Sequence, residues 1–254
     1  MIRKDIYKKF SLSSFPIWNC PACQVGTIIL DKKSINTYET RASLEFHGHD
    51  AWEPDWVNET FYGTLTCTNP KCKDIVIVVG DVEVELDAEY SMEGLEREPY
   101  VELYTIKFTY PPLDLFYIPD AVPEDIKDIL KLSFGLYFYS PSSAANQTRI
   151  ALEKVITSLK IKVYQSKAGK RKRIALHDRI NLLPAKYDKE KKLFLAIKWL
   201  GNAGSHDNII SHSDLLDLYD IFETLLREVY GQDEKRISKL AKEVNKRKGP
   251  KKKR

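Results

Sequence analysis

The feature that most constrains this chain is a set of four cysteines in two closely spaced pairs. The first pair is Cys20-Pro21-Ala22-Cys23 and the second is Cys67-Thr68-Asn69-Pro70-Lys71-Cys72. Such short spacings let both sulfurs of a turn face one ion, and two turns complete a tetrahedron of thiolates with no open position for a substrate. The pattern predicts one structural Zn²⁺ held by Cys20, Cys23, Cys67 and Cys72. The alternative is a set of free or redox-active thiols.

The composition is that of an ordered protein with one large domain or two ordinary ones. The chain has 254 residues, of which 43% are hydrophobic, and no apolar run approaches the ~20 residues of a membrane span. Its charged start, Met1-Ile2-Arg3-Lys4-Asp5, is not followed by the apolar stretch of a signal peptide. We therefore expect a cytoplasmic protein without a membrane partner, in which cysteines bind metal rather than form disulfides.

Charge is distributed unevenly along the chain. Residues 235–254 contain eleven lysines and arginines and one acid, Glu243, whereas the whole chain carries only +4. The remainder is therefore net acidic. This asymmetry predicts a tail that contacts polyanions; the simpler interpretation is a solvated terminus that aids solubility.

The first half of the sequence has the patterns of β-strands. Residues 81–86 and 100–108 alternate polar and apolar side chains, as half-exposed strands do. Shorter apolar runs flank the cysteine pairs and predict further strands at residues 26–30, 62–66 and 75–79. Pro111-Pro112 ends the region, because proline cannot donate to a β-ladder. Strands on both sides of two cysteine turns are typical of a zinc ribbon.

The second half has the patterns of helices. Pro123-Glu124-Asp125 opens the first helix, since proline and acids favour the first turn. Pro141-Ser142-Ser143 separates it from the second, and shorter helices are predicted at residues 174–183 and 189–200. The last helix carries apolar residues spaced three and four apart, from Leu215 to Val229. Residues 165–173 are interpreted as a basic connector.

A glycine-containing segment interrupts this helical pattern. In Lys198-Trp199-Leu200-Gly201-Asn202-Ala203-Gly204-Ser205-His206-Asp207, each glycine costs about 1 kcal/mol in a helix interior relative to alanine. The simpler interpretation is a helix end with a left-handed cap. The alternative is a turn that allows close approach and presents Asn202 and His206 into a groove.

These segments resemble a bacterial domain of unknown function assigned to the HEPN superfamily, and a cysteine ribbon before such a domain also resembles that family. The similarity covers residues 119–231, and its segments are Gly201-Asn202-x-x-x-His206, Ala144 to Glu153, Leu176 to Ile180 and Leu226 to Tyr230. The expected fold class is therefore α+β, with a four-cysteine zinc-ribbon β domain in residues 1–118, an all-α HEPN-like helical bundle in 119–231 and a basic C-terminal tail in 232–254.

The resemblance also implies chemistry, since many HEPN domains are metal-independent ribonucleases of toxins and antiphage systems. Their motif is an arginine, a polar residue, three variable residues and a histidine. Here Gly201 stands where the arginine belongs. A ribonuclease would use His206 as general acid and base, Asn202 to orient, and a cation from Lys198 or Arg149. The alternative role for Arg149 is an ion pair with Glu153 one helical turn away.

Because the motif arginine is absent, we expect a nucleic-acid-associated binding or regulatory module in bacterial or phage defence, without robust ribonuclease activity. The alternatives are the ribonuclease itself and a structural subunit of a defence complex. The expected partners are a second copy bound through the helical domain, RNA or DNA, and a protein of a defence system. Candidate nucleic-acid contacts are the basic residues Lys170, Arg171, Lys172, Arg173, Lys251, Lys252, Lys253 and Arg254.

Several aromatic and imidazole side chains lie between the cysteine pairs. His47 and His49 are expected in an exposed loop, the alternative being a second metal site. Trp18, Trp52 and Trp56 are expected to cover the small core of the β domain, the alternative being stacking on bases.

Overall fold

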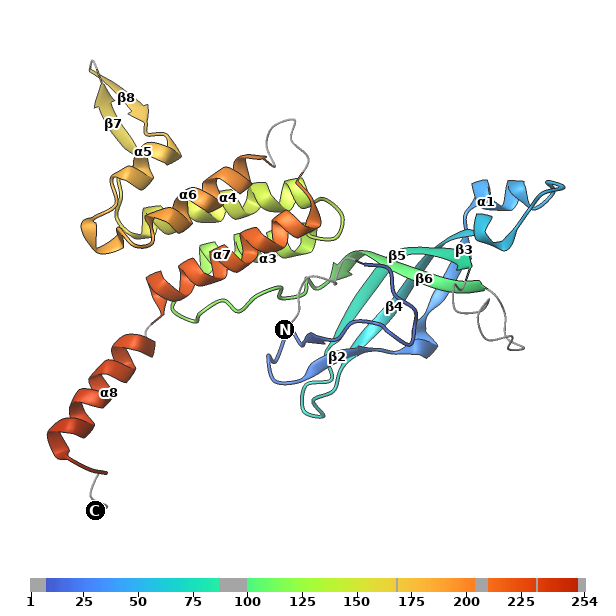
Figure 1. The fold of residues 1–254 in the computed structure, drawn as a ribbon, viewed down its shortest axis with the longest axis horizontal. Coiled ribbons are helices and arrows are strands. Elements are labelled where there is room, and N and C mark those ends of the chain that lie inside the picture. The colour runs from blue at the N-terminus through green and yellow to red at the C-terminus, as the bar shows by residue number, and fades with distance from the viewer. Residues whose placement is uncertain (1–7, 87–99, 168, 204–209, 232, 251–254) are drawn as a thin grey trace.

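A computed structural model describes residues 8–86, 100–167, 169–203, 210–231 and 233–250. An antiparallel sheet occupies the first part of the chain and helices dominate the second (Figure 1). None of the helices within these ranges combines the length and the apolar character that crossing a membrane requires.

The sheet has six strands and is antiparallel at every pairing. Its main path runs β1-β2-β4-β5-β6, and β3 pairs with β4 beyond the end of β2. The strands are β1 (Trp18–Asn19), β2 (Thr27–Leu30), β3 (Asn36–Glu39), β4 (Asn58–Cys67), β5 (Ile75–Leu86) and β6 (Tyr100–Tyr110).

The two strands predicted at residues 75–79 and 81–86 form the single long strand β5, which pairs with β6 across a bulge. The register with β6 shifts between Val79 and Gly80. A Cβ at Gly80 would lie only 2.0 Å from the carbonyl oxygen of Thr105, so only glycine lets the two backbones approach this closely. Because the extra residue, Lys107, lies in β6, Val78 and Val82 of β5 keep their regular alternation on the buried face, and Ile106 and Thr109 of β6 are both buried.

One face of the sheet is covered by the N-terminal segment. Phe10 forms an isolated bridge with Tyr104 of β6, and its ring meets Phe15 edge-on, as Phe15 does Trp18. These aromatic rings cover the inward row that includes Phe61 of β4. Within the described residues, the connections between strands carry the short elements η2 (Lys32–Ser34), α1 (Arg41–Phe46) and η3 (Pro54–Trp56).

The second part contains four longer helices packed around one core, a short helix, a 3₁₀ turn, a hairpin and a terminal helix. The core helices are α3 (Glu124–Leu136), α4 (Pro141–Ser158), α6 (Lys191–Ala203) and α7 (His212–Tyr230). The other elements are the strands β7 (Tyr164–Lys167) and β8 (Lys170–Arg173), the helix α5 (Leu176–Asn181), the turn η4 (Ala185–Tyr187) and the helix α8 (Asp233–Arg247).

The helical core is closely packed and mostly apolar. The rings of Phe116, Phe134, Tyr219 and Phe222 contact one another, mostly edge-on or tilted. The hydroxyl of Tyr219 is completely buried and forms a hydrogen bond of 2.8 Å with Ser133 Oγ. A buried hydroxyl needs such a partner, because leaving it unpaired costs about 1–3 kcal/mol.

The predicted fold class is wrong in both parts. The first part is a curled sheet of six strands with the cysteines at one end, not a small zinc ribbon, because β4, β5 and β6 extend far beyond the cysteine turns. The second part is not all-α, since residues expected to form a basic connector pair as the β7-β8 hairpin. Gly169 closes this hairpin with φ of +72°, a left-handed conformation that glycine adopts without strain.

Candidate metal centre and nucleic-acid interface

The four cysteines come together at one end of the sheet. Cys20 follows β1, Cys67 ends β4 and Cys72 precedes β5. The four sulfur atoms all lie within 4.8 Å of one another, with 3.8 Å between Cys20 and Cys72 and 3.7 Å between Cys23 and Cys67. Four sulfurs at about 2.3 Å from a tetrahedral ion are about 3.8 Å apart. The arrangement therefore fits a metal ion.

The backbone around the sulfurs is shaped for this close approach. Gln24 and Lys73, which directly follow the second cysteine of each pair, both have φ of 55°. Gly26 donates its N–H to Cys23 Sγ at 3.4 Å, and a Cβ at Gly26 would lie only 2.7 Å from Cys67 Sγ. The two turns thus bring the four sulfurs together and place backbone N–H groups where they can donate to them, as thiolate ligands require.

The thiols interact with the backbone and with one another, so their pKa values diverge. Backbone N–H groups, that of Gly26 above all, lower the pKa of Cys23 to about 6. The pKa of Cys72 is about 12, because burial and the neighbouring cysteines outweigh the lowering effect of the Asp74 N–H. Burial also raises the pKa of Cys67. Four thiolates this close repel one another, and a divalent cation supplies the charge that stabilises them.

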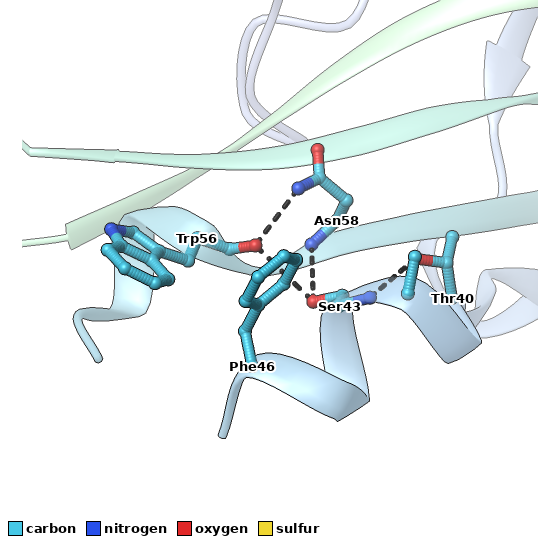
Figure 2. A pocket seen from close by; sticks show the side chains of 6 residues that line it. Thr40, Ser43, Phe46, Trp56 and Asn58 are labelled. Atoms are coloured by element: carbon cyan, nitrogen blue, oxygen red, sulfur yellow. Dashed lines mark hydrogen bonds between the residues drawn. The ribbon is translucent and has the colours of Figure 1, made fainter. Parts of the chain in front are cut away.

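The segment between the cysteine pairs forms a pocket of about 440 Å³, which Figure 2 shows. Phe46 and Trp56 line it and meet edge-on at 5.7 Å. Its serine hydroxyl is already bonded, since Ser43 Oγ donates to Glu39 at 2.6 Å and accepts from the Asn58 N–H at 3.1 Å. The pocket is therefore a mostly apolar recess in which the Ser43 hydroxyl already has partners within the chain.

The histidines and tryptophans of this region contact one another rather than a shared centre. His47 Nε2 lies 2.7 Å from Glu39 Oε1 and its ring packs on Trp52, whereas His49 packs on Trp56. Among the described residues, the cysteine set is the one group of His, Cys, Asp and Glu side chains placed to hold a metal. Trp18 is buried under the sheet, as expected of a core residue.

The predicted basic contacts at Lys170, Arg171, Lys172 and Arg173 form strand β8 and are all exposed. Figure 1 shows the hairpin projecting away from the helices. The guanidinium of Arg171 lies over the Tyr164 ring, 3.9 Å from its centroid. Lys170 and Lys172 have no ion pair within the part of the chain that the structure describes. The hairpin therefore presents cations and an aromatic ring together.

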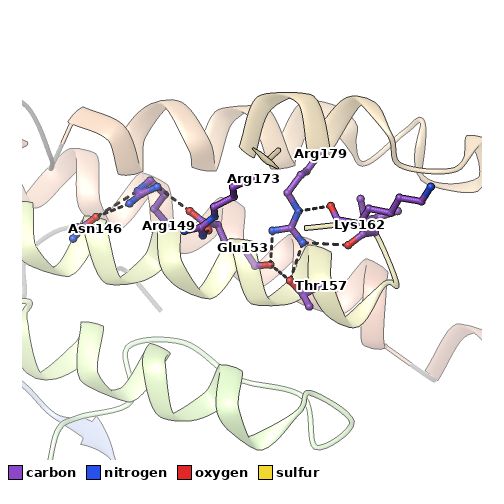
Figure 3. Close-up of polar contacts among 8 residues, drawn as sticks. Asn146, Arg149, Glu153, Thr157, Lys162, Arg173 and Arg179 are labelled. Carbon is purple, nitrogen blue, oxygen red and sulfur yellow. Dashed lines mark hydrogen bonds and ion pairs between the residues drawn. The ribbon is translucent and has the colours of Figure 1, made fainter. Parts of the chain in front are cut away.

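A network of arginines anchors this hairpin to helix α4 (Figure 3). Glu153 binds Arg149 at 2.9 Å and Arg173 at 2.5 Å. Arg179 is only 2% exposed and donates to Thr157 Oγ1 at 2.8 Å and to the Lys162 carbonyl at 3.2 Å. Burial lowers the pKa of Arg179, yet a guanidinium stays charged in proteins. Sequence reasoning included Arg179 only within the segment from Leu176 to Ile180, as part of the family resemblance, and gave no role to Arg179 or to Tyr164.

The proposed catalytic residues are only partly brought together. Gly201 of α6 packs against α4, where a Cβ would lie 2.7 Å from Arg149 Cβ and 3.3 Å from the Ala145 carbonyl. An arginine at position 201 would not fit this contact. Arg149 takes its expected alternative role and pairs with Glu153, and Lys198 Nζ lies 3.4 Å from the centre of the exposed Trp199 ring.

Three other proposed positions need separate mention. Asn202 lies in the last turn of α6 and is partly buried. His206 lies outside the described residues. So do Lys251, Lys252, Lys253 and Arg254 of the basic tail, although α8 before them is exposed from Lys239 onward.

Comparison with known families divides the chain at nearly the same place as the fold. Residues 8–109 match a domain of unknown function, DUF8608, and residues 133–247 match another, DUF4145. No curated protein and no solved structure matches the chain. Neither family description names an activity or a ligand, so the resemblance to HEPN domains remains a prediction.

Proposed function

We propose that this protein is a cytoplasmic nucleic-acid-binding module whose β domain is stabilised by one structural zinc ion. The observation that carries the proposal is the exposed β7-β8 hairpin, in which four successive cations lie beside an aromatic ring. Phosphates are neutralised by lysine and arginine, and bases stack on aromatic side chains in a sequence-tolerant way. The ribonuclease, the helical-domain dimer and a role in defence remain predictions.

Zinc is the metal we assign to the cysteine site. Four sulfur ligands leave no position for water or substrate, which is the arrangement of structural zinc. The spacing of 3.8 Å and 3.7 Å between paired sulfurs also fits an iron with four thiolate ligands. Elemental analysis of the purified protein and its visible absorption distinguish the two, since zinc is colourless. We expect one zinc per chain.

Single strands are the nucleic-acid class that the hairpin suits best. Tyr164 is half-exposed beneath Arg171, and Trp199 is 60% exposed with Lys198 over its ring and His177 beside it at 6.4 Å. His177 lies in α5, the helix that follows the hairpin. Stacking a base on such a ring contributes about 1–3 kcal/mol, and unpaired bases alone can reach it.

The test measures binding of labelled single-stranded and duplex oligonucleotides over a range of salt concentrations. The variant Lys170→Gln/Lys172→Gln removes two exposed cations that have no ion pair among the described residues. We expect weaker binding and a salt dependence whose slope falls by about 0.7 for each phosphate of a single strand that is no longer neutralised. Tyr164→Ala should weaken single-strand binding without changing that slope.

The matched control is Lys32→Gln/Lys33→Gln, which removes the same charge from an exposed turn of the β domain. It should bind like the wild type. A third protein that ends at residue 232 measures the contribution of α8 and the tail. The proposal is wrong if the hairpin variant and the control bind nucleic acid equally well.

A further inference from the structure

The open face of the sheet carries more apolar side chains than a solvent-facing surface needs. We define it by Tyr38, Tyr62, Ile75, Ile77, Phe108 and Tyr110, all of them exposed. Strands with one face in water normally alternate apolar and polar residues, whereas strands buried on both faces are continuously apolar. Residues 75–79 of β5 are apolar at every position, although only alternate ones are buried. The sequence is thus that of a sheet covered on both sides.

The strand register makes these side chains one continuous surface. Ile77 of β5 is directly opposite Tyr110 of β6, and Tyr62 and Phe108 are both opposite Val79. Tyr38 extends the surface onto β3, where its ring stacks on Tyr62 with an interplanar angle of 13°. No described helix covers this face.

Charged side chains are confined to one end of the face, and there they are paired. At the bulge, the extra residue Lys107 lies 3.2 Å from Asp81. Beyond it, Lys9 binds both Glu83 at 2.7 Å and Glu85 at 2.5 Å. The six described residues that define the open face include no cation that would bind phosphate. It therefore does not suit a nucleic acid, and it resembles the centre of a protein interface, where aromatic residues are enriched and charges are depleted.

We infer that a second copy of this chain packs on the open face, so that two sheets stack face to face. Stacked sheets lie about 10 Å apart with interdigitating side chains. Large residues lie beside small ones here, since Thr64 of β4 is directly opposite Ile77 of β5, which is in turn opposite Tyr110 of β6. A surface without charge can face its own copy without repulsion, and this two-fold contact is the commonest mode of self-association.

The exposed area is close to what such a dimer requires. A large aromatic side chain buries about 150–250 Å², and Tyr38 and Tyr110 are 62% and 65% exposed. Together with the four half-exposed side chains they offer on the order of 700 Å², close to the ~800 Å² that each partner contributes to a standard interface. This contact is separate from the hairpin and from the dimer that the HEPN resemblance implies for the helical domain.

Sedimentation equilibrium of the full, zinc-loaded chain tests the inference. The variant Ile77→Lys/Tyr110→Lys places two charges at the centre of the face, and the control Leu132→Lys/Tyr139→Lys makes the same change at exposed residues of the helical part. We expect the wild type and the control to be dimers at micromolar concentrations. The open-face variant should associate at least ~100-fold more weakly, because each copy would bury unpaired ammonium groups.

Zinc content and circular dichroism should be unchanged in both variants, since all four positions are exposed. A wild type that stays monomeric overturns the inference, and so does a dimer that only the helical control disrupts. A wild-type monomer whose open-face variant loses RNA binding would assign the face to nucleic acid instead. The oligomeric state by itself tests only the open face, because the variants that test the hairpin proposal leave the sheet intact.

Discussion

The β domain and the helical domain bury their apolar surfaces in different ways. In the helical domain, apolar residues of α3, α4, α6 and α7 that have no exposure to solvent surround one another. In the β domain, one face of the sheet is covered by a short N-terminal segment, the other is open, and four sulfurs cluster at one end. The helical domain therefore depends on its own core, whereas under the two proposals above the β domain also depends on a bound metal ion and a second copy.

The largest expected effect is that of removing the metal. Structural zinc contributes apparent binding energies of about 10–16 kcal/mol, which are folding energy for the domain that holds it. Cys67→Ser should therefore unfold the β domain and leave the helices folded. Tryptophan fluorescence, dominated by Trp18, Trp52 and Trp56, should change, while the helical far-ultraviolet circular dichroism should not.

Lys71→Gln is the matched control, because it changes an exposed residue within the same cysteine turn. It should keep both zinc and the wild-type melting profile. Simultaneous unfolding of both domains in Cys67→Ser would show that the helical core does not fold independently. The proposed difference between the two domains would then be wrong.

The second effect is the converse one, a destabilisation confined to the helical core. Phe222 of α7 is completely buried against Phe116, and truncating such a residue to alanine costs about 3–5 kcal/mol. Phe222→Ala should lower the melting temperature of the helices and leave the zinc content unchanged. Glu228→Ala, at an exposed position of the same helix, should change neither quantity.

The cysteine cluster could be predicted from the sequence, but the sheet around it could not. Spacings within each cysteine pair fix a local geometry, so Cys20 and Cys23 must lie close together whatever the rest of the chain does. Pairing along β4, β5 and β6 depends instead on long-range register. Nothing local to Gly80 indicates that the strand continues through it opposite a bulge in β6, so the sequence pattern predicts two strands where the structure has one.

The hairpin was missed because its residues have no apolar periodicity. Lys170 to Arg173 are all charged, and alternation of apolar and polar side chains is the main sequence signal for a strand. The turn at Gly169 and the anchoring of Arg173 by Glu153 determine the structure here. Contacts between distant residues therefore shape the surface to which we assign function, and a single sequence does not reveal them.

A smaller effect tests why glycine occupies position 201. Gly201→Ala should gain about 1 kcal/mol of helix propensity, but its Cβ would meet Arg149 Cβ at 2.7 Å and force α6 away from α4. Overpacking of this kind costs about 1–3 kcal/mol, so we expect a net destabilisation in urea unfolding. Gly135→Ala is the matched control, since its Cβ would find an ordinary contact of 3.4 Å with Pro112. The control should be neutral or stabilising, and equal behaviour of the two variants would contradict the packing explanation.

The smallest effect concerns the start of α7, where Ser211 and Asp214 form a capping box. Ser211 Oγ accepts the Asp214 N–H at 3.1 Å, and the Asp214 carboxylate accepts the Ser211 N–H at 3.0 Å. Removing such a cap costs about 0.5–2 kcal/mol, so Ser211→Ala should destabilise only the helical domain. Ser213→Ala, exposed in the same turn, should be close to neutral.

The pH dependence of this cap identifies its mechanism. Hydrogen bonds from the Ser211 side chain and then its backbone lower the pKa of Asp214 below its ordinary value. A carboxyl group with a lowered pKa in the folded state stabilises the fold above its unfolded pKa, and this contribution disappears as pH falls through the folded pKa. The difference in unfolding free energy between wild type and Ser211→Ala should therefore be constant near neutral pH and shrink in acid. The Ser211 hydroxyl alone would accept the Asp214 N–H at any pH. If the difference in unfolding free energy stays constant down to the acid limit, the stabilisation therefore comes from that one bond and not from the reciprocal pair.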